Sequence, residues 1–118
     1  MTLQLEFGDI IWAEIADANG IRKERPVVII TPDVQITPAG ILDVVAITSM
    51  LSVPLPDDHV LLPWHAQGHP RTGLNRKSAA VCSWMAQVSA TEVRSVVGFV
   101  PGPLLIEIMS KLSAAPPA

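Results

Sequence analysis

Most basic residues of this 118-residue chain lie in two short segments, and positive charge at that density could bind phosphate groups. Six of the eight lysines and arginines fall within Arg22–Arg25 and Arg71–Lys77, where Glu24 is the only acid. An arginine side chain can hold two phosphoryl oxygens at once through its planar guanidinium group. If the segments meet in the folded chain, they form a positive groove on a body whose net charge is −3. If they do not, they are solvated loops.

Two tryptophans flank the second basic segment, with Trp64 before it and Trp84 after it. Aromatic faces beside positive charge are typical of single-stranded RNA binding, where each stacked base contributes roughly 1–3 kcal/mol. Trp64, in a proline-bounded loop, is the better stacking candidate, because Trp84 also fits the core or a dimer interface. Four polar residues of the segment are expected to contact phosphates or bases: Arg71, Asn75, Arg76 and Lys77.

The histidines and the cysteine predict no metal site. His59, His65 and His69 lack the spacing of metal ligands, and no cysteine or carboxylate pair completes a set. A histidine could exchange protons with RNA near neutral pH, but a solvated loop is the default interpretation of all three. Cys82, alone in an apolar stretch, is expected to be a small buried side chain.

The composition indicates one domain without a membrane segment. Hydrophobic residues make up 49% of the chain, which is ample for one core at this length. The apolar runs are too short to cross a bilayer, and the first residues lack the features of a signal peptide. A single cysteine excludes an internal disulfide, so we expect a cytoplasmic protein.

Short apolar runs between turn residues predict five to seven β-strands. The β-branched run Val27–Ile30 indicates a strand covered on both faces. From Leu42 to Ser49, alternate side chains point in opposite directions, so Thr48 and Ser49 face different sides. Further strands are expected at 10–15, 59–62, 77–83 with a bend leading into 87–89, and 96–100.

The C-terminal segment has helical spacing instead. Pro103 suits the first turn of a helix, and apolar residues follow at Leu104, Leu105, Ile108, Met109 and Leu112. Residues 1–112 are therefore predicted to form a single mainly β domain, a small SH3-like β-barrel with a C-terminal α-helix. Residues 113–118 are predicted to be a disordered tail.

Five short motifs occur in an order, and with gaps, that resemble the PemK/MazF toxin family. They are Gly8–Trp12, Arg25–Ile30, Ile47–Ser49, Gly73-Leu74 with Ser78, and Val97–Val100 before the helix. Each motif is weak by itself, but together they extend over about residues 7 to 112.

This resemblance implies an SH3-like barrel that forms a homodimer. It implies the toxin of a type II toxin–antitoxin system, acting as a metal-independent, sequence-selective endoribonuclease on single-stranded RNA. It also implies a cognate antitoxin protein with an acidic flexible tail, and no cofactor. CcdB-like relatives share the fold and poison DNA gyrase, so the fold alone does not define the activity.

The resemblance assigns the chemistry to two strand ends. Arg25 matches the family's catalytic arginine, which stabilises the charged phosphorane, and Thr48 matches a residue that hydrogen-bonds a phosphate oxygen. Glu24 is the carboxylate of the first loop and the candidate base. The neighbouring residues expected to bind RNA are Arg22, Lys23 and Ser49.

Two features of many family members are missing. The family's Gly-Ser-Glu-Gln loop is replaced by Asn19–Glu24, and its Cys-Asp-Gln with a following arginine is replaced by Cys82–Trp84 with Ala86. Either a different group serves as base, or the protein is a catalytically inactive PemK-like binding module or a CcdB-like gyrase poison. A third hypothesis is an adaptor for proline-rich peptides, which the absence of tyrosine disfavours.

Overall fold

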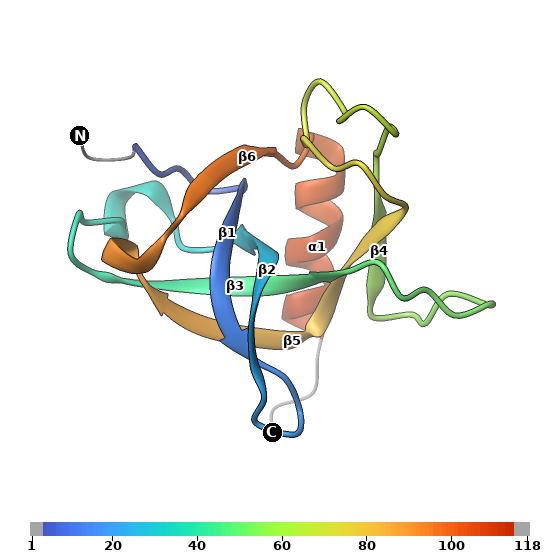
Figure 1. Cartoon of the computed structure of the whole chain (residues 1–118), viewed down its shortest axis with the longest axis horizontal. Helices are drawn as coiled ribbons and strands as arrows, with labels where there is room; N and C mark the ends of the chain where they lie inside the picture. The colour runs from blue at the N-terminus through green and yellow to red at the C-terminus, as the bar shows by residue number, and fades with distance from the viewer. Residues whose placement is uncertain (1–3, 115–118) are drawn as a thin grey trace.

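The computed structural model describes residues 4–114 of the chain (Figure 1). This part forms a mainly β domain with one C-terminal α-helix, which confirms the predicted fold class. Its strands are β1 (Asp9–Ala16), β2 (Arg22–Ile29), β3 (Ile41–Thr48), β4 (His59–Leu62), β5 (Ser78–Ser89) and β6 (Ser95–Phe99), and its helix is α1 (Gly102–Ala114). Two short 3-10 turns, η1 (Asp33–Gln35) and η2 (Ala90–Glu92), lie in the connections of this part of the chain.

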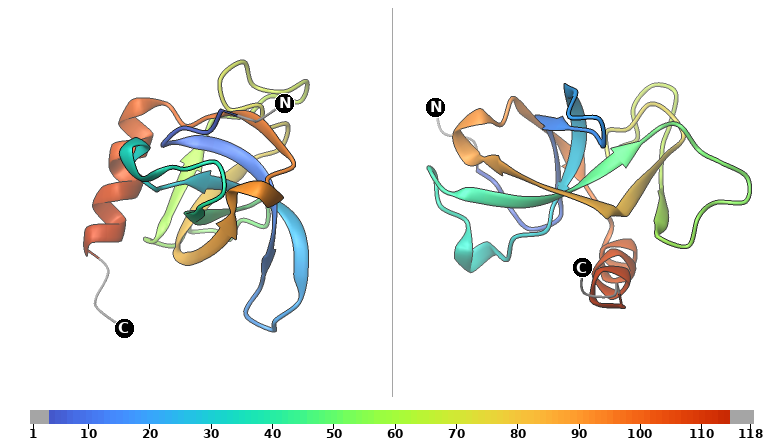
Figure 2. Two further views of the ribbon diagram at one scale, coloured as in Figure 1. Left: turned by 90° about the vertical axis from the view of Figure 1, so that its left-hand side faces the viewer. Right: turned by 90° about the horizontal axis from the view of Figure 1, so that it is seen from below.

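The strands follow the predicted apolar runs, with two differences. β2 starts earlier than its apolar run, because its polar first half pairs with β1 in a hairpin. The bend predicted near residue 83 lies within β5 and is a register shift against β3 (Figure 2). Val45 of β3 pairs with Met85, whereas the next residue of β3 pairs with Val81. Residues 82–84 are therefore a bulge, which bends β5.

The six strands form one antiparallel sheet in the order β4-β5-β3-β2-β1-β6. The loop over residues 63–77, which connects β4 to β5, reaches the other edge of the sheet. There the Phe99 N–H donates a hydrogen bond to the Arg71 carbonyl (2.8 Å). Gly73 and Gly98 permit this approach, because a Cβ at either position would collide with the backbone of the facing segment. The loop thereby closes the gap between the two edge strands of a barrel-like sheet.

Both faces of the sheet are apolar. Val28 and Ile30 of the β2 run belong to a core cluster that includes Ile108 of α1, whereas Val27 and Ile29 belong to a second cluster on the opposite face. Neighbouring residues therefore alternate between the clusters, which confirms that this run is covered on both sides. Each such side chain contributes roughly 1.5–3 kcal/mol when fully buried.

The helix α1 packs on β4 and β5 (Figure 2). It starts where the Leu104 and Leu105 N–H groups donate to the Pro101 carbonyl. It continues to Ala114, so residues 113 and 114 of the predicted tail are helical, and residues 115–118 lie outside the described part. Among residues 4–114 no helix is long and apolar enough to span a membrane.

Candidate active site

The middle of β2 and the end of β3 bring Arg25 and Thr48 together. The ladder between these strands pairs Val27 with Ala46. Side chains alternate along a strand, so the same register carried two residues further places Arg25 opposite Thr48 on one face. On its other side β2 is supported by β1, through the pair of Ala13 with Arg25. The two residues that the family resemblance singles out therefore lie side by side on adjacent strands.

A pocket of ≈ 530 Å³ opens beside Arg25 and Thr48. Its walls come from β1, β2, β3, β6 and the end of the 63–77 loop. The predicted site residues in its lining are Glu24, Arg25, Thr48, Ser49, Asn75 and Arg76. The two basic segments thus meet here through Arg25 and Arg76, which is the arrangement that a phosphate-binding groove requires.

The guanidinium group of Arg25 lies over an aromatic ring. Its Cζ atom lies 5.0 Å from the centroid of the Trp84 ring, within the range of a cation–π interaction. Its Nε atom is buried and has no hydrogen-bond partner among residues 4–114. Buried donors in folded proteins are nearly always paired, so this N–H is an exception among the described side chains.

The hydroxyl group of Thr48 is oriented by the turn that follows β3. Its Oγ1 atom accepts a hydrogen bond from the Met50 N–H at 3.1 Å. A hydroxyl group can accept and donate at the same time. The Thr48 hydrogen is therefore available to an acceptor in the pocket.

Glu24 lies opposite another carboxylate on the hairpin, because β1 and β2 pair Glu14 with Glu24. Like charges at such a position repel each other, and each of the two carboxylates is paired with an arginine. Arg22 Nε lies 3.0 Å from Glu14 Oε1, and Arg94 Nε lies 3.6 Å from Glu24 Oε2. Glu24 lines the pocket, whereas Arg22 is paired with Glu14 outside it.

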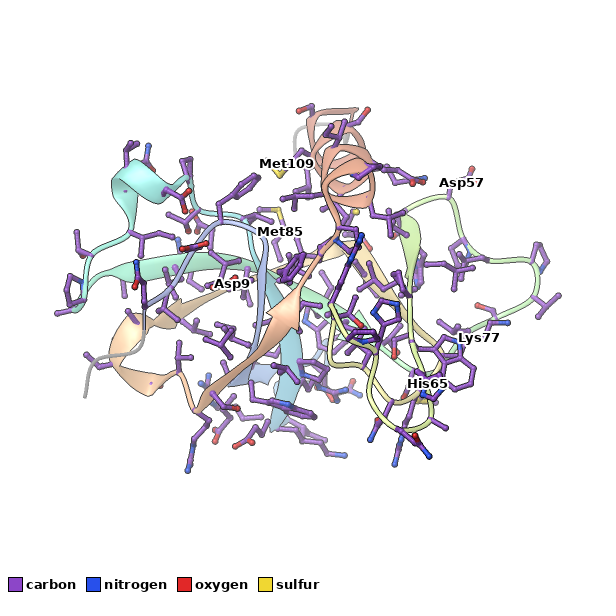
Figure 3. The ribbon with its side chains drawn as sticks, turned by 90° about the horizontal axis from the view of Figure 1, so that it is seen from above. Asp9, Asp57, His65, Lys77, Met85 and Met109 are labelled. Carbon is purple, nitrogen blue, oxygen red and sulfur yellow. The ribbon has the colours of Figure 1, made fainter. Side chains whose placement is uncertain are left out.

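Five of the predicted RNA-binding residues do not line this pocket: Arg22, Lys23, Trp64, Arg71 and Lys77. All five are exposed, with 45% of Trp64 accessible to solvent. Figure 3 shows Lys77 and His65, both in the connection between β4 and β5, at one end of the molecule. The structure therefore separates the predicted site into a pocket group and an outer group.

Two histidines order the 63–77 loop. His65 Nδ1 accepts a hydrogen bond from the Gln67 N–H, and His69 Nδ1 accepts one from the Arg71 N–H, each at 3.1 Å. An accepting Nδ1 carries no proton, so these bonds place the ring hydrogen on Nε2. Within the described residues, no group of three or more histidine, cysteine or acidic side chains is arranged to hold a metal ion.

The bulge of β5 is tied to the start of β4. Asp58 accepts a hydrogen bond from the Ser83 hydroxyl, and its Oδ1 lies 2.7 Å from His59 Nδ1. These bonds, first from Ser83 and then from His59, lower the pKa of Asp58. Cys82 is buried, as predicted, and its burial raises the pKa of the thiol, which disfavours the reactive thiolate.

Solved structures of MazF toxins share this fold. Form I of MazF from Deinococcus radiodurans has a TM-score of 0.73 at 17% identity, with 93% of this chain and 94% of that chain covered. A Mycobacterial endoribonuclease in complex with its cognate antitoxin has a TM-score of 0.68 at 14% identity, covering 95% and 94%. The Mycobacterium tuberculosis toxin MazF-mt6 has a TM-score of 0.66 at 19% identity, covering 90% and 93%. No curated protein sequence matches the chain.

The family model of the PemK-like, MazF-like toxins of type II toxin–antitoxin systems matches residues 6–115. The chain therefore belongs to this family of toxins, which confirms the resemblance carried by the five sequence motifs. The six-stranded antiparallel sheet and C-terminal helix are the fold of its MazF structures.

The apolar part of the pocket lining was not predicted. Trp12, Leu74 and Val97 all line the pocket. Trp12 could be found by counting the hairpin register back from its turn, since it pairs with Pro26. Val97 carries no comparable signal, because it reaches the pocket only through the contact between β6 and the 63–77 loop.

Proposed function

We propose that this toxin is a metal-independent, sequence-selective endoribonuclease that cleaves single-stranded RNA in the pocket between β2 and β3. The observation that carries the proposal is that a cation, Arg25, and a hydroxyl group whose hydrogen is free to donate, that of Thr48, line the same pocket. A phosphodiester offers acceptor oxygens to both groups at once. The family and the fold shared with endoribonucleases support the same activity.

The reaction needs few groups. The 2′-oxygen of a ribose attacks the adjacent phosphorus, and the bond from phosphorus to the 5′-oxygen breaks. The products are a 2′,3′-cyclic phosphate and a 5′-hydroxyl, so a base takes the 2′-hydroxyl proton and an acid protonates the leaving oxygen. Arg25 offsets the negative charge that develops on the nonbridging oxygens, and Thr48 donates its hydroxyl hydrogen to one of them.

Glu24 is the candidate for the group that accepts the 2′-hydroxyl proton. Glu24 lines the pocket, and the ion pair of its carboxylate with Arg94 is long, at 3.6 Å, and exposed. An exposed pair of this kind contributes little free energy, so RNA can displace Arg94. A general base typically contributes roughly 10²–10⁴-fold to the rate.

The remaining polar residues define a path for the RNA strand. Ser49, Asn75 and Arg76 line the pocket, so they would contact the nucleotides on either side of the cleaved bond. Beyond the pocket, four exposed cations would bind phosphates: Arg22, Lys23, Arg71 and Lys77. The exposed ring of Trp64 would stack on a base. Contacts with bases at both places would make cleavage selective for sequence.

We also propose that the toxin forms a homodimer and is inhibited by a cognate antitoxin whose acidic, flexible tail lies in the basic pocket. The MazE–MazF complex of Deinococcus radiodurans and the Mycobacterial endoribonuclease–antitoxin complex contain chains of this fold. An acidic peptide would compete with RNA for Arg25 and Arg76. Bound antitoxin and RNA cleavage would then exclude each other.

Cleavage of a long single-stranded RNA in EDTA by purified, antitoxin-free protein tests the proposal. Wild type is expected to leave cyclic-phosphate or 3′-phosphate ends and 5′-hydroxyls. Arg25→Ala is expected to lower kcat roughly 10²–10³-fold, as for other preorganised donors, with a small fall in melting temperature from the lost contact with Trp84. Arg22→Ala is the matched control, because it removes an arginine of the same strand from outside the pocket and should raise KM only.

Full activity of Arg25→Ala would contradict the assignment of the site. Failure of folded wild type to cut several RNAs would contradict the proposed activity.

A second candidate function is binding without cleavage, either of RNA or of DNA gyrase. It is favoured by two positions at which this chain lacks the acid and the arginine that many family members carry. Ser83 is hydrogen-bonded to Asp58, and Ala86 packs against the second core cluster. Protein that binds RNA without cutting it, or that inhibits supercoiling by gyrase, would support this function.

A further inference from the structure

The bulge in β5 places Trp84 beneath the arginine of the proposed active site. Val45 and Ala46 of β3 pair with Met85 and Val81 of β5, so residues 82–84 of β5 have no partner in β3. A bulge of this kind turns a side chain away from its regular direction. Trp84 packs against the second core cluster and lies 5.0 Å, centroid to Cζ, from Arg25.

The Trp84 ring is itself fixed. Its Nε1–H donates a hydrogen bond of 3.2 Å to the Ala16 carbonyl at the end of β1. One edge of the indole is thus anchored to the β1–β2 hairpin, and the ring is half-buried. A fixed ring is a suitable platform for a side chain that has several rotatable bonds.

We propose that Trp84 is a positioning residue, which holds the Arg25 guanidinium in the orientation that binds the scissile phosphate. A carboxylate could also orient the arginine, but it would neutralise the charge and occupy the N–H donors that the phosphate needs. An aromatic face orients the guanidinium and leaves its N–H donors unoccupied. The buried Arg25 Nε, which has no partner among residues 4–114, is the result expected of such a clamp.

This inference rests on the proposed ribonuclease function, and two variants test it. Trp84→Leu keeps an apolar side chain but removes the aromatic face, so kcat is expected to fall roughly 10- to 100-fold through misplacement of Arg25, with KM little changed. Trp84→Phe keeps an aromatic face but loses the Nε1–H bond to Ala16, so its kcat is expected to lie between those of wild type and Trp84→Leu. In an Arg25→Ala background, Trp84→Leu should cause no further loss, because the residue it positions is gone.

A second measurement does not depend on activity. The NMR order parameter of the Arg25 Nε–H bond is expected to be high in wild type, intermediate in Trp84→Phe and lowest in Trp84→Leu. Equal Arg25 mobility in wild type and Trp84→Leu overturns the inference, whether or not RNA is cut. Cleavage at the wild-type rate by Trp84→Leu overturns it too. If wild type is inactive, the proposed function fails and the order parameters alone decide this inference.

Discussion

The hydroxyl group of Thr48 has a defined direction of action, because the Met50 N–H occupies a lone pair of its oxygen at 3.1 Å. The hydrogen is then left to donate, which suits a phosphate oxygen and would not suit a positively charged ligand. Arg25, on the neighbouring strand, is also a hydrogen-bond donor, since a guanidinium group donates and does not accept. Arg25 and Thr48 together therefore offer hydrogen-bond donors to an anion.

Thr48→Val tests this polarity, because valine has the shape of threonine without the hydroxyl. We expect kcat to fall roughly 10²-fold, as for loss of a preorganised donor, and stability to fall by about 1 kcal/mol because the Met50 N–H loses its acceptor. Thr48→Ser should retain most of the activity. Single-turnover cleavage and thermal melting measure the two effects, and equal rates for Val and Ser would show that the hydroxyl is not used.

The junction of β4 with the β5 bulge is held by a carboxylate with a lowered pKa. Asp58 is favoured in its charged form by hydrogen bonds from Ser83 and His59. Its folded pKa therefore lies below the value of 3.8 for an unperturbed side chain. Its contribution to stability is complete above that value and is lost as the pH falls through the folded pKa.

Asp58→Asn is accordingly expected to lower the free energy of unfolding at neutral pH and to cost progressively less as the pH falls below about 3.8. Urea titrations at several pH values measure this difference. Asp57→Asn is the neighbouring control, since Lys111 bonds only the backbone carbonyl of Asp57. A cost for Asp58→Asn that is the same at every pH would contradict the role of its charge.

The contact between β6 and the 63–77 loop depends on the absence of a side chain at Gly98. A Cβ there would overlap the backbone of Arg71 and Thr72. Gly98→Ala is expected to destabilise the protein by about 1–3 kcal/mol, the usual range for overpacking. Gly102→Ala, where an added Cβ meets nothing within 4 Å, should leave the melting temperature nearly unchanged. Similar melting temperatures for both variants would show that the loop can move aside.

Local pattern accounts for most of the elements. The run Val27–Ile30 has no polar residue to expose, so its burial on both faces follows from composition, and alternation correctly separates Val44 from Val45. Arg25 and Thr48 could be singled out through the family resemblance, and their strands explain why they meet. The Trp84–Arg25 contact could not be foreseen, because it depends on the length of a bulge that only tertiary packing sets.

The molecule as a whole carries a net charge of −3 but brings cations together at one site. Arg25 and Arg76 come from distant segments and both line the pocket. RNA would therefore be attracted locally while most of the surface repels it. Such a surface favours binding of a short stretch of RNA over nonspecific coating of a long strand.

The salt dependence of RNA binding tests this distribution. For single strands each phosphate contact contributes roughly −0.7 to the slope of log K against log salt. With Arg25 and Arg76 in the pocket and the four exposed cations beside it, we expect a slope of about −4 for a non-cleavable 2′-O-methyl oligonucleotide, measured by fluorescence anisotropy. Arg76→Ala should reduce the slope by about 0.7, and Lys111→Ala on α1 should not. A slope near zero would exclude charge-driven binding.

The 63–77 loop both closes the sheet and delivers Asn75 and Arg76 to the pocket. An insertion there would disturb the barrel and the RNA path together. The segment over residues 50–57 is under no such constraint: it starts at Met50, which lines the pocket, and its Val53 is 97% exposed. During evolution of these toxins, a change in the RNA sequence that is cleaved should therefore come from changes in residues 50–57. The length of the 63–77 loop should stay constant.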